Sequence, residues 1–214
     1  MLLYGSTMSP FVRKVVAFAA EKDIALELKR IGLNDPDPGF AAASPFRKMP
    51  AFDDDGFLLA DSSAICHYLE AKHPDPALIP AEAQARGRTI WYDEFADTIL
   101  FTCVGAMYFN RVVAPRFLGR EGDLIAADKA ERETLPHILD YLEGVIFDGE
   151  FLVGDALSLA DLAVASPFVN LRHCGVTIEA AHYPRVVRYT SNILARPSFA
   201  KSIEREDAFL ARTA

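Results

Sequence analysis

Ser9 is the residue of this chain whose type and position first indicate chemistry. It stands directly before Pro10, and a serine followed by a proline is typical of the start of a helix. The ordinary interpretation is therefore an N-cap. The other interpretation is a reactive site, because the N–H groups at a helix N-terminus stabilise a bound anion, including an ionised sulfur. Among the nearby hydroxyls, Tyr4 is interpreted as a strand aromatic, and Ser6 and Thr7 as loop residues.

Two later segments also carry side chains that could bind a ligand. Lys48 is by default a solvated loop cation, and Pro50 begins an apolar run in which either peptide isomer is tolerated. Asp61 and Ser62 are typical helix N-cap residues.

The composition of the chain excludes several classes of protein. It has 214 residues, 51% of them hydrophobic, with a net charge of −8, which argues against disorder and against nucleic-acid binding. The three cysteines are far apart and form no C-x-x-C pair, so neither a disulfide framework nor a metal site is expected, and the cytoplasm is the expected location. The longest uncharged stretch, 98–110, is too short to span a membrane, and we expect no secretory signal.

Periodicity predicts alternating strands and helices in residues 1–77. The order is a strand, a helix, a strand parallel to the first, a loop or short helix, a two-stranded hairpin and a helix. Ile24, Leu26 and Leu28, at spacing two, indicate the second strand. Asp55-Gly56 between two apolar segments is the strongest signal for the hairpin. The helical face of the first helix is formed by Val12, Val15, Val16 and Ala19.

The rest of the chain is predicted to be helical. After a proline-rich linker at 73–76, residues 90–108 form a long apolar helix that is expected to end before Pro115. Residues 135–146 have a second helical face, in which Pro136 marks either a start or a kink. Ser158 and Asp161 have the spacing of a capping box, and helices over 185–194 and 199–210 follow.

Four motifs in order resemble the cytosolic glutathione transferase family, in its serine-type phi and theta members. The segment 3–15, with Met8-Ser9-Pro10-Phe11, is similar to the turn that carries the catalytic serine. Lys48-Met49-Pro50-Ala51 is similar to the K-V-P-A turn with its cis proline. Asp61-Ser62-Ser63-Ala64-Ile65 resembles the E-S-x-A-I stretch, and the segment 154–161 resembles the capping box of the family's sixth helix.

The resemblance implies an α/β thioredoxin-like N-terminal domain followed by an all-α C-terminal helical domain. The expected boundaries are residues 1–77 for the glutathione-binding domain and 84–214 for the domain that forms the electrophile pocket. It also implies a cytoplasmic homodimer with glutathione as co-substrate and no metal. The expected reaction is attack by the glutathione thiolate on a hydrophobic electrophile or a peroxide, in detoxification.

The resemblance assigns the glutathione contacts residue by residue. It implies that the Ser9 hydroxyl donates to the thiolate and that Lys48 contacts the glycyl carboxylate. A cis Pro50 would let the Met49 backbone pair with the cysteinyl unit, as an added strand does. Asp61 and Ser62 would then bind the γ-glutamyl end. No cysteine precedes Pro10, which disfavours thiol exchange.

The second-substrate pocket is expected from Phe11, Tyr108 and Arg111, all of which have ordinary alternatives. An aromatic stripe on the long helix is also typical of a core or a dimer surface, and Arg111 is equally a solvated cation. Asp97 is either an exposed helix charge or a contact to the partner subunit's glutathione. The alternatives for function are a glutathione-dependent isomerase or dehalogenase on the same fold, and a non-catalytic adaptor or ligand-binding protein.

Overall fold

The computed structural model describes residues 1–147 and 149–212. The first half contains a four-stranded sheet in the order β2-β1-β3-β4. The strands are β1 (Leu2–Gly5), β2 (Glu27–Arg30), β3 (Ala51–Asp54) and β4 (Phe57–Ala60). β1 pairs in parallel with β2, and β3 pairs antiparallel with both β1 and β4. The predicted order of strands and helices and the parallel pair are thus confirmed.

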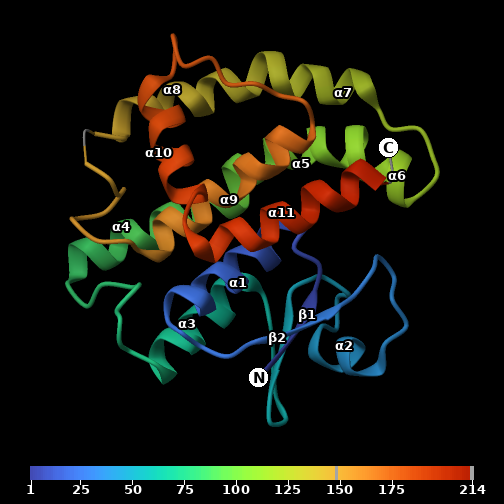
Figure 1. Ribbon diagram of the computed structural model, residues 1–214, viewed down its shortest axis with the longest axis vertical. Coiled ribbons are helices and arrows are strands. Elements are labelled where there is room, and N and C mark those ends of the chain that lie inside the picture. The colour runs from blue at the N-terminus through green and yellow to red at the C-terminus, as the bar shows by residue number, and fades with distance from the viewer. Residues whose placement is uncertain (148, 213–214) are drawn as a thin grey trace.

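Helices cover both faces of this sheet. Leu3 and Tyr4 are neighbours in β1, so their side chains point to opposite faces. Leu3 belongs to the core beneath α1 (Pro10–Glu21) and α3 (Ser62–Lys72), whereas Tyr4 clusters with Phe40 of α2 (Pro38–Ala43). α1 and α3 therefore lie between the sheet and the helical half, as Figure 1 shows.

The second strand begins later than its sequence pattern predicts. Ile24 and Leu26 precede the strand, which starts at Glu27. The reason is the end of α1: Asp23 has a φ of 52°, and the N–H of Ile24 donates to the Ala19 carbonyl at 2.9 Å. This backbone turn occupies Ile24, so only Leu28 of the predicted strand residues lies within β2.

The predicted hairpin is confirmed with the expected turn residues. Asp55 and Gly56 connect β3 to β4 and have positive φ angles of 52° and 91°. Positive φ at both central residues matches the right-handed twist of the paired strands. α3 then begins as predicted, with the Asp61 side chain accepting from the N–H groups of Ser63 and Ala64.

The second half begins with a continuous helix of 35 residues, Ala83–Phe117. It consists of α4 (Ala83–Glu94), α5 (Phe101–Tyr108) and α6 (Ala114–Phe117), joined by π-helical turns at Phe95–Leu100 and Phe109–Val113. The sequence predicts that this helix ends before Pro115, and that prediction is wrong because the helix continues to Phe117. Pro115 stands in the first turn of α6, just after the wide turn, where its missing N–H is tolerated.

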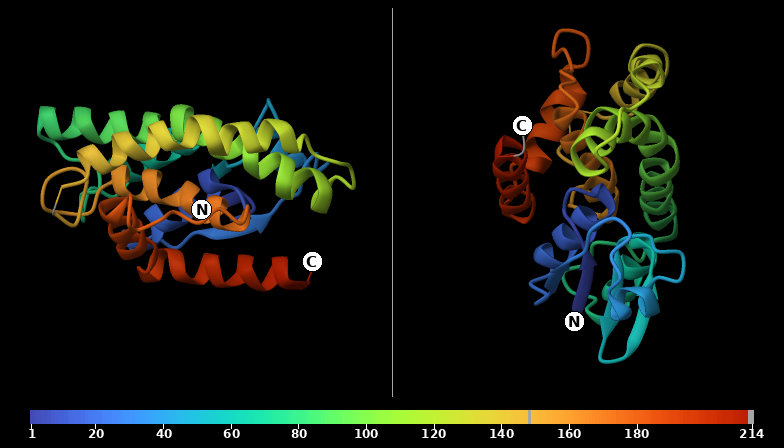
Figure 2. Two further views of the ribbon diagram at one scale, coloured as in Figure 1. Left: turned by 90° about the horizontal axis from the view of Figure 1, so that it is seen from above. Right: turned by 90° about the vertical axis from the view of Figure 1, so that its right-hand side faces the viewer.

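This long helix has the length and composition of a membrane span, but it packs as a core helix. It contacts α9 (Leu159–His173) along α4 and α5. Leu100, Val104 and Met107 on that side are buried in the main core. In Figure 2 the long helix and α11 (Pro197–Arg212) lie on opposite sides of the molecule.

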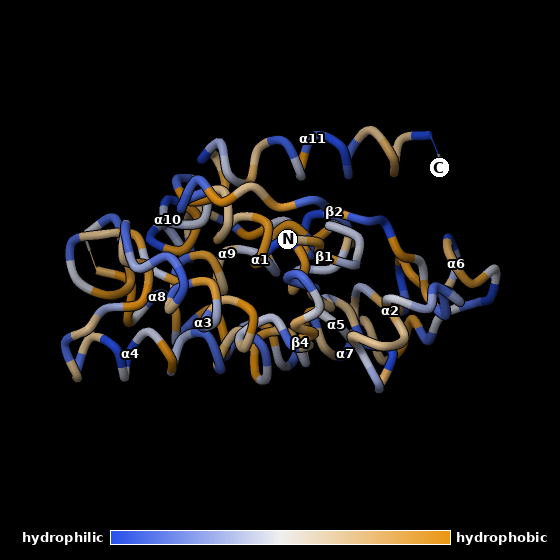
Figure 3. Tube along the Cα trace, turned by 90° about the horizontal axis from the view of Figure 1, so that it is seen from below, coloured by the Kyte–Doolittle hydropathy of each residue, from blue (hydrophilic) through white to orange (hydrophobic). Residues whose placement is uncertain are grey.

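Pro136 stands in the first turn of a helical segment that continues directly from the segment before it. α7 (Leu124–Lys129) continues through a π-helical turn at Ala130–Thr134 into α8 (Leu135–Val145), so Pro136 stands inside a longer helix. α10 (Pro184–Leu194) and α11 confirm the last two predicted helices. Figure 3 shows α11 along the edge of the molecule, with hydrophilic and hydrophobic residues interspersed.

α9 is the central helix of the structure, and residues 159–171 are all buried. Its predicted capping box is confirmed: the N–H of Ser158 donates to the Asp161 carboxylate at 2.9 Å. The Asp161 carboxylate also accepts from the Leu152 N–H and the Tyr189 hydroxyl. One continuous core extends from β1 and α1 to α10, so the two halves share their interior.

Candidate active site

Ser9 is the N-cap residue of α1, with an extended backbone (φ −81°, ψ 126°). Its N–H donates to the Ser6 carbonyl at 2.9 Å, which fixes the turn that precedes the helix. In the part of the chain that the structure describes, its half-buried side chain makes no capping hydrogen bond. The hydroxyl thus stands at a helix N-terminus and is available to a ligand.

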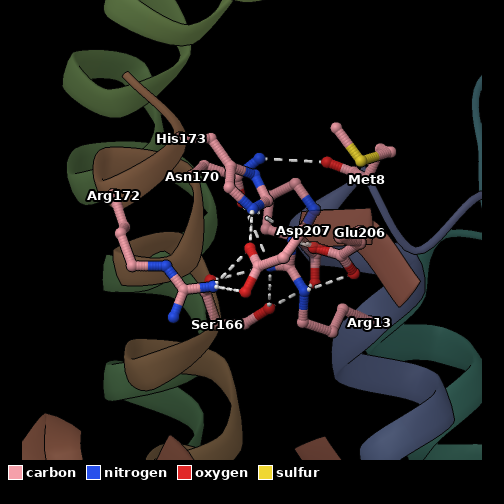
Figure 4. A network of polar contacts seen from close by, with 9 residues as sticks. Met8, Arg13, Ser166, Asn170, Arg172, His173, Glu206 and Asp207 are labelled. Atoms are coloured by element: carbon pink, nitrogen blue, oxygen red, sulfur yellow. Dashed lines mark hydrogen bonds and ion pairs between the residues drawn. The ribbon is translucent and has the colours of Figure 1, made fainter. Parts of the chain in front are cut away.

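The two residues that flank Ser9 are held by side chains of α9. The Asn170 side-chain amide donates to the Met8 carbonyl at 3.0 Å, and the Ser166 hydroxyl donates to the Pro10 carbonyl at 2.8 Å (Figure 4). Both side chains are buried. Because α9 is the most buried helix, the Ser9 turn is anchored to the most rigid part of the molecule.

Arg13 connects this anchor to α11. Its guanidinium donates to both carboxylate oxygens of Glu206, at 3.1 and 2.7 Å, in a bidentate pair that is completely buried. A third nitrogen donates to the Ser166 carbonyl and to the Asn170 side-chain oxygen. The pair is thus satisfied on all sides, as a buried charge requires, and it fixes the side chains that hold the Ser9 turn.

A second buried network lies at the N-terminus of α3. Lys14 donates to Asp93 and Asp97 of the long helix, both at 2.7 Å, and to the Ser63 hydroxyl at 3.2 Å. Asp97 also accepts from the hydroxyls of Ser62 and Ser63. Burial opposes the charge of Lys14, but the two carboxylates prevail and raise its pKa. Lys14 therefore remains a cation beneath the start of α3.

Asp97 is thus not an exposed helix charge, because it pairs with Lys14 and accepts hydrogen bonds from Ser62 and Ser63 of its own chain. Its side chain is 18% exposed, and burial raises its pKa although Lys14 opposes the shift. Asp61, next to this network, is exposed and caps α3. The network links α1, five residues beyond Ser9, to the α3 N-terminus with Ser62.

The loop before β3 contains the other predicted glutathione contacts. The Met49–Pro50 peptide bond is cis, the isomer that the sequence resemblance implies. Lys48 is exposed, and its N–H and carbonyl both bond to the Ser44 hydroxyl. Lys48 is therefore held through its backbone, while its ammonium extends toward solvent.

Of the three predicted pocket residues, Tyr108 lies in a cluster with the Ser9 turn. It packs with Met8 and Val112, and burial raises the pKa of its phenol. Its hydroxyl has no hydrogen-bond partner among the described residues. Phe11 packs edge-on against Phe101, with ring centroids 4.6 Å apart.

Arg111 points toward α7 and the turn that follows it. It forms ion pairs with Asp128 at 2.7 Å and with Glu131 at 2.5 Å. Its charge is therefore compensated within the chain. Within residues 1–147 and 149–212, no group of three or more His, Cys, Asp or Glu side chains could hold a metal ion.

The anchoring residues have weak signals in the sequence. Arg13 and Lys14 lie outside the predicted apolar face of α1, where a charged residue is normally exposed, yet both are buried. Ser166 and Asn170 are spaced four apart in an otherwise apolar helix, so they share one face. That polar pair is the one feature of α9 that indicates a buried network.

Comparison with known proteins identifies the family. A model of the glutathione S-transferase N-terminal domain matches residues 3–77, and a model of the C-terminal domain matches residues 120–206. A glutathione S-transferase from Hyoscyamus muticus is 30% identical over 210 residues, covering 95% of this chain and 98% of that protein. The chain belongs to the glutathione S-transferase family.

A theta member of the family is among the relatives of this chain. Glutathione S-transferase theta-3 of Mus musculus is 30% identical over 182 residues, covering 82% of this chain and 75% of that protein. A solved glutathione S-transferase-I, bound with lactoylglutathione, superposes with a TM-score of 0.83 at 25% identity and covers 95% of this chain and 98% of the other. The thioredoxin-like domain with a helical domain is therefore the shared fold.

Proposed function

We propose that this glutathione S-transferase binds glutathione with its sulfur at Ser9 and transfers it to a hydrophobic electrophile. The observation that carries the proposal is the Ser9 hydroxyl, which makes no capping bond at the N-terminus of α1 and is anchored on both sides by α9. A hydroxyl donor and helix N–H groups together stabilise a thiolate. The thiolate forms the new S–C bond as the leaving group departs. With a peroxide, it bonds to one oxygen as the O–O bond breaks and an alcohol leaves, and a second glutathione then converts the sulfenic acid to the disulfide and water.

Thiol ionisation accounts for only part of the expected catalysis. A thiol with a pKa of ~8.5 is about 3% ionised at pH 7, and one with a pKa of ~6.5 is about 75% ionised. The gain is at most roughly 25-fold, and lower nucleophilicity reduces it further. The remaining acceleration must come from holding both reactants in attack geometry, so the anchored turn around Ser9 is as important as its hydroxyl.

The other glutathione contacts are proposed from the resemblance together with the geometry. Lys48 contacts the glycyl carboxylate, the backbone of Met49 before the cis Pro50 pairs with the cysteinyl unit, and Asp61 and Ser62 bind the γ-glutamyl end. The exposed ammonium of Lys48 supports its role. The α3 N-terminus supports the binding of the glutamyl carboxylate at Ser62.

The second substrate is proposed to lie against the Tyr108 side of the Ser9 turn. Tyr108 clusters with Met8, next to Ser9, and supports that side of the turn from within the core. Phe11 and Arg111 are the other two residues proposed for this pocket, and Arg111 would have to leave its ion pairs with Asp128 and Glu131 to contact a substrate there. The three free cysteines fit a location in the cytoplasm.

The test is glutathione binding by calorimetry together with turnover of 1-chloro-2,4-dinitrobenzene. We expect Asp61→Ala to weaken glutathione binding and Ser9→Ala to lower kcat/KM by about 10- to 30-fold, since it removes the thiolate's donor. The control is Ser191→Ala, an exposed serine on α10. Unchanged turnover in Ser9→Ala would refute the role of Ser9, and absence of glutathione binding in the unaltered protein would refute the proposed function.

A further inference from the structure

A cavity of about 320 Å³ lies between the end of β2, the turn before Ser9 and the last two turns of α11. It is distinct from the predicted glutathione contacts at Lys48, Pro50 and Asp61, none of which lines it. Its wall combines apolar side chains, among them Met8, with three guanidinium groups. Those groups belong to Arg30, Arg205 and Arg212.

The three arginines give the cavity a positive charge, and all three are exposed to solvent. Arg30 lies over the Phe209 ring, 5.8 Å from its centroid, and the Arg212 Nε donates to the Ala208 carbonyl. Within residues 1–147 and 149–212, none of the three forms an ion pair with a carboxylate. The whole chain carries a net charge of −8, so a cluster of three arginines is a local positive patch on an acidic protein.

The one acidic residue of the wall is already engaged. Both carboxylate oxygens of Glu206 accept from Arg13, which lies behind the cavity in the buried network. Glu206 therefore neutralises Arg13 and not the three arginines of the wall. Guanidinium groups bind carboxylates through paired charge-assisted hydrogen bonds, which are stronger than hydrogen bonds between neutral groups.

The cavity shares a wall with the turn that carries Ser9. Ser6, Thr7 and Met8 line it, and the Ser6 carbonyl accepts from the Ser9 N–H at 2.9 Å. Met8 also clusters with Tyr108 on the proposed second-substrate side. A molecule bound in this cavity therefore contacts the turn that leads into Ser9, although Ser9 itself does not line the cavity.

We propose that this cavity binds the carboxylate of the second substrate and makes the enzyme select anionic aromatic electrophiles. The apolar wall at Leu28, Met8 and Phe209 accommodates the ring, while Arg30, Arg205 and Arg212 bind the carboxylate. This inference rests on the proposed transferase function for its reaction. Its binding component can be measured without any reaction.

The binding test uses two unreactive probes of the same shape, 3-nitrobenzoate and 3-nitrobenzamide. By calorimetry we expect the benzoate to bind at least tenfold more tightly. Arg30→Gln and Arg205→Gln should each weaken the benzoate at least fivefold and leave the benzamide nearly unchanged. The control is Arg132→Gln, which removes the same charge from an exposed arginine on the helix that continues α7. Equal affinity for the two probes, or equal losses in all three variants, would overturn the proposal.

The activity test uses 4-chloro-3-nitrobenzoate and 4-chloro-3-nitrobenzamide with glutathione. The thiolate sulfur bonds to the ring carbon that bears chlorine, chloride leaves with the bonding electron pair, and the thiol proton passes to solvent. For each compound, kcat/KM is divided by the rate constant of its uncatalysed reaction with glutathione. We expect the ratio of the benzoate value to the benzamide value to be at least ten. Arg205→Gln should bring that ratio toward one, and Arg132→Gln should not.

The two tests separate the inference from the function on which it rests. If the benzamide is turned over and the benzoate has no advantage, the carboxylate site is wrong and the transferase stands. If neither compound is turned over while benzoate binding depends on Arg30 and Arg205, the carboxylate site stands and the transferase function is wrong.

Discussion

His173 is a buried imidazole surrounded by charged groups from three helices. Its Nε2 lies 3.4 Å from Asp207 Oδ1 and 3.9 Å from Glu206 Oε2, both on α11. Arg13 of α1 and Arg172 of α9 are close enough to influence it. Burial lowers the pKa of His173 to about 4; the two arginines act in the same direction, and Asp207 opposes them. His173 is therefore neutral in the folded protein at pH 7.

This shift predicts how stability depends on pH. The unfolded chain binds a proton at this histidine below pH ~6.5, whereas the folded chain does so only near pH 4. The free energy of unfolding should therefore decrease as pH falls from about 6.5 to about 4, by roughly 2–3 kcal/mol from this residue. Urea unfolding at intervals across that window measures the slope.

The matched comparison isolates His173 from the other titrating groups. His173→Gln should flatten the slope between pH 4 and 6.5, because the glutamine does not titrate. His137→Gln, at an exposed histidine on α8, should leave it as in the unaltered protein. A slope of equal size in both variants would show that His173 does not carry the effect.

At the scale of elements, the start of α9 depends on Asp161. Its carboxylate is fully buried and accepts from the N–H groups of Leu152 and Ser158 and from the Tyr189 hydroxyl. The Ser158 hydroxyl also donates to this carboxylate, so Asp161→Ala leaves four donors without it, and an unpaired buried donor costs about 1–3 kcal/mol. We expect a loss of about 3–5 kcal/mol in the free energy of unfolding, measured by urea denaturation.

Asp161→Asn is the matched variant, because it keeps one acceptor oxygen and nearly the same shape. It should lose less stability than the alanine variant. If Asp161→Ala changed the unfolding free energy by less than about 1 kcal/mol, the capping box would not be what holds α9 and the connection before it.

Elements with local signals could be predicted from the sequence, and contacts between distant residues could not. Asp55-Gly56 marks a turn and Ser158 with Asp161 marks a helix start, because the interacting groups are within three residues. Arg13 and Ser166 are 153 positions apart, so no window of sequence contains their contact. The helix through Pro115 is also missed, because the sequence does not show the π-helical turn before it.

In the candidate site too, the features with local signals could be predicted from the sequence and the contacts between distant residues could not. Ser9 at a helix start and the order of the four motifs are visible in the sequence, and the family is confirmed. The networks that hold the site depend on α9, α11 and the long helix meeting α1 in three dimensions. Arg30 and Arg205 likewise come together only through folding, at the end of β2 and on α11.

At the scale of the whole molecule, we propose that two copies form the expected homodimer through exposed apolar side chains. Phe46, before β3, is 87% exposed, and Phe57 in β4 is 48% exposed. On the long helix Trp91 is 49% exposed. In a two-fold dimer the same surface is used twice, so the first half of one copy can cover the long helix of the other.

Phe46→Glu tests this interface without affecting the core, because the ring is almost entirely in solvent. We expect the dimer to dissociate at least tenfold more readily, since a buried unpaired carboxylate is costly at an interface. Sedimentation over a range of concentrations distinguishes the 23.6 kDa chain from twice that mass. The control is Ile125→Glu on α7, where the side chain is 84% exposed. Equal dissociation in both variants would place the interface elsewhere, and an unaltered protein that sediments as a monomer at micromolar concentration would contradict the dimer itself.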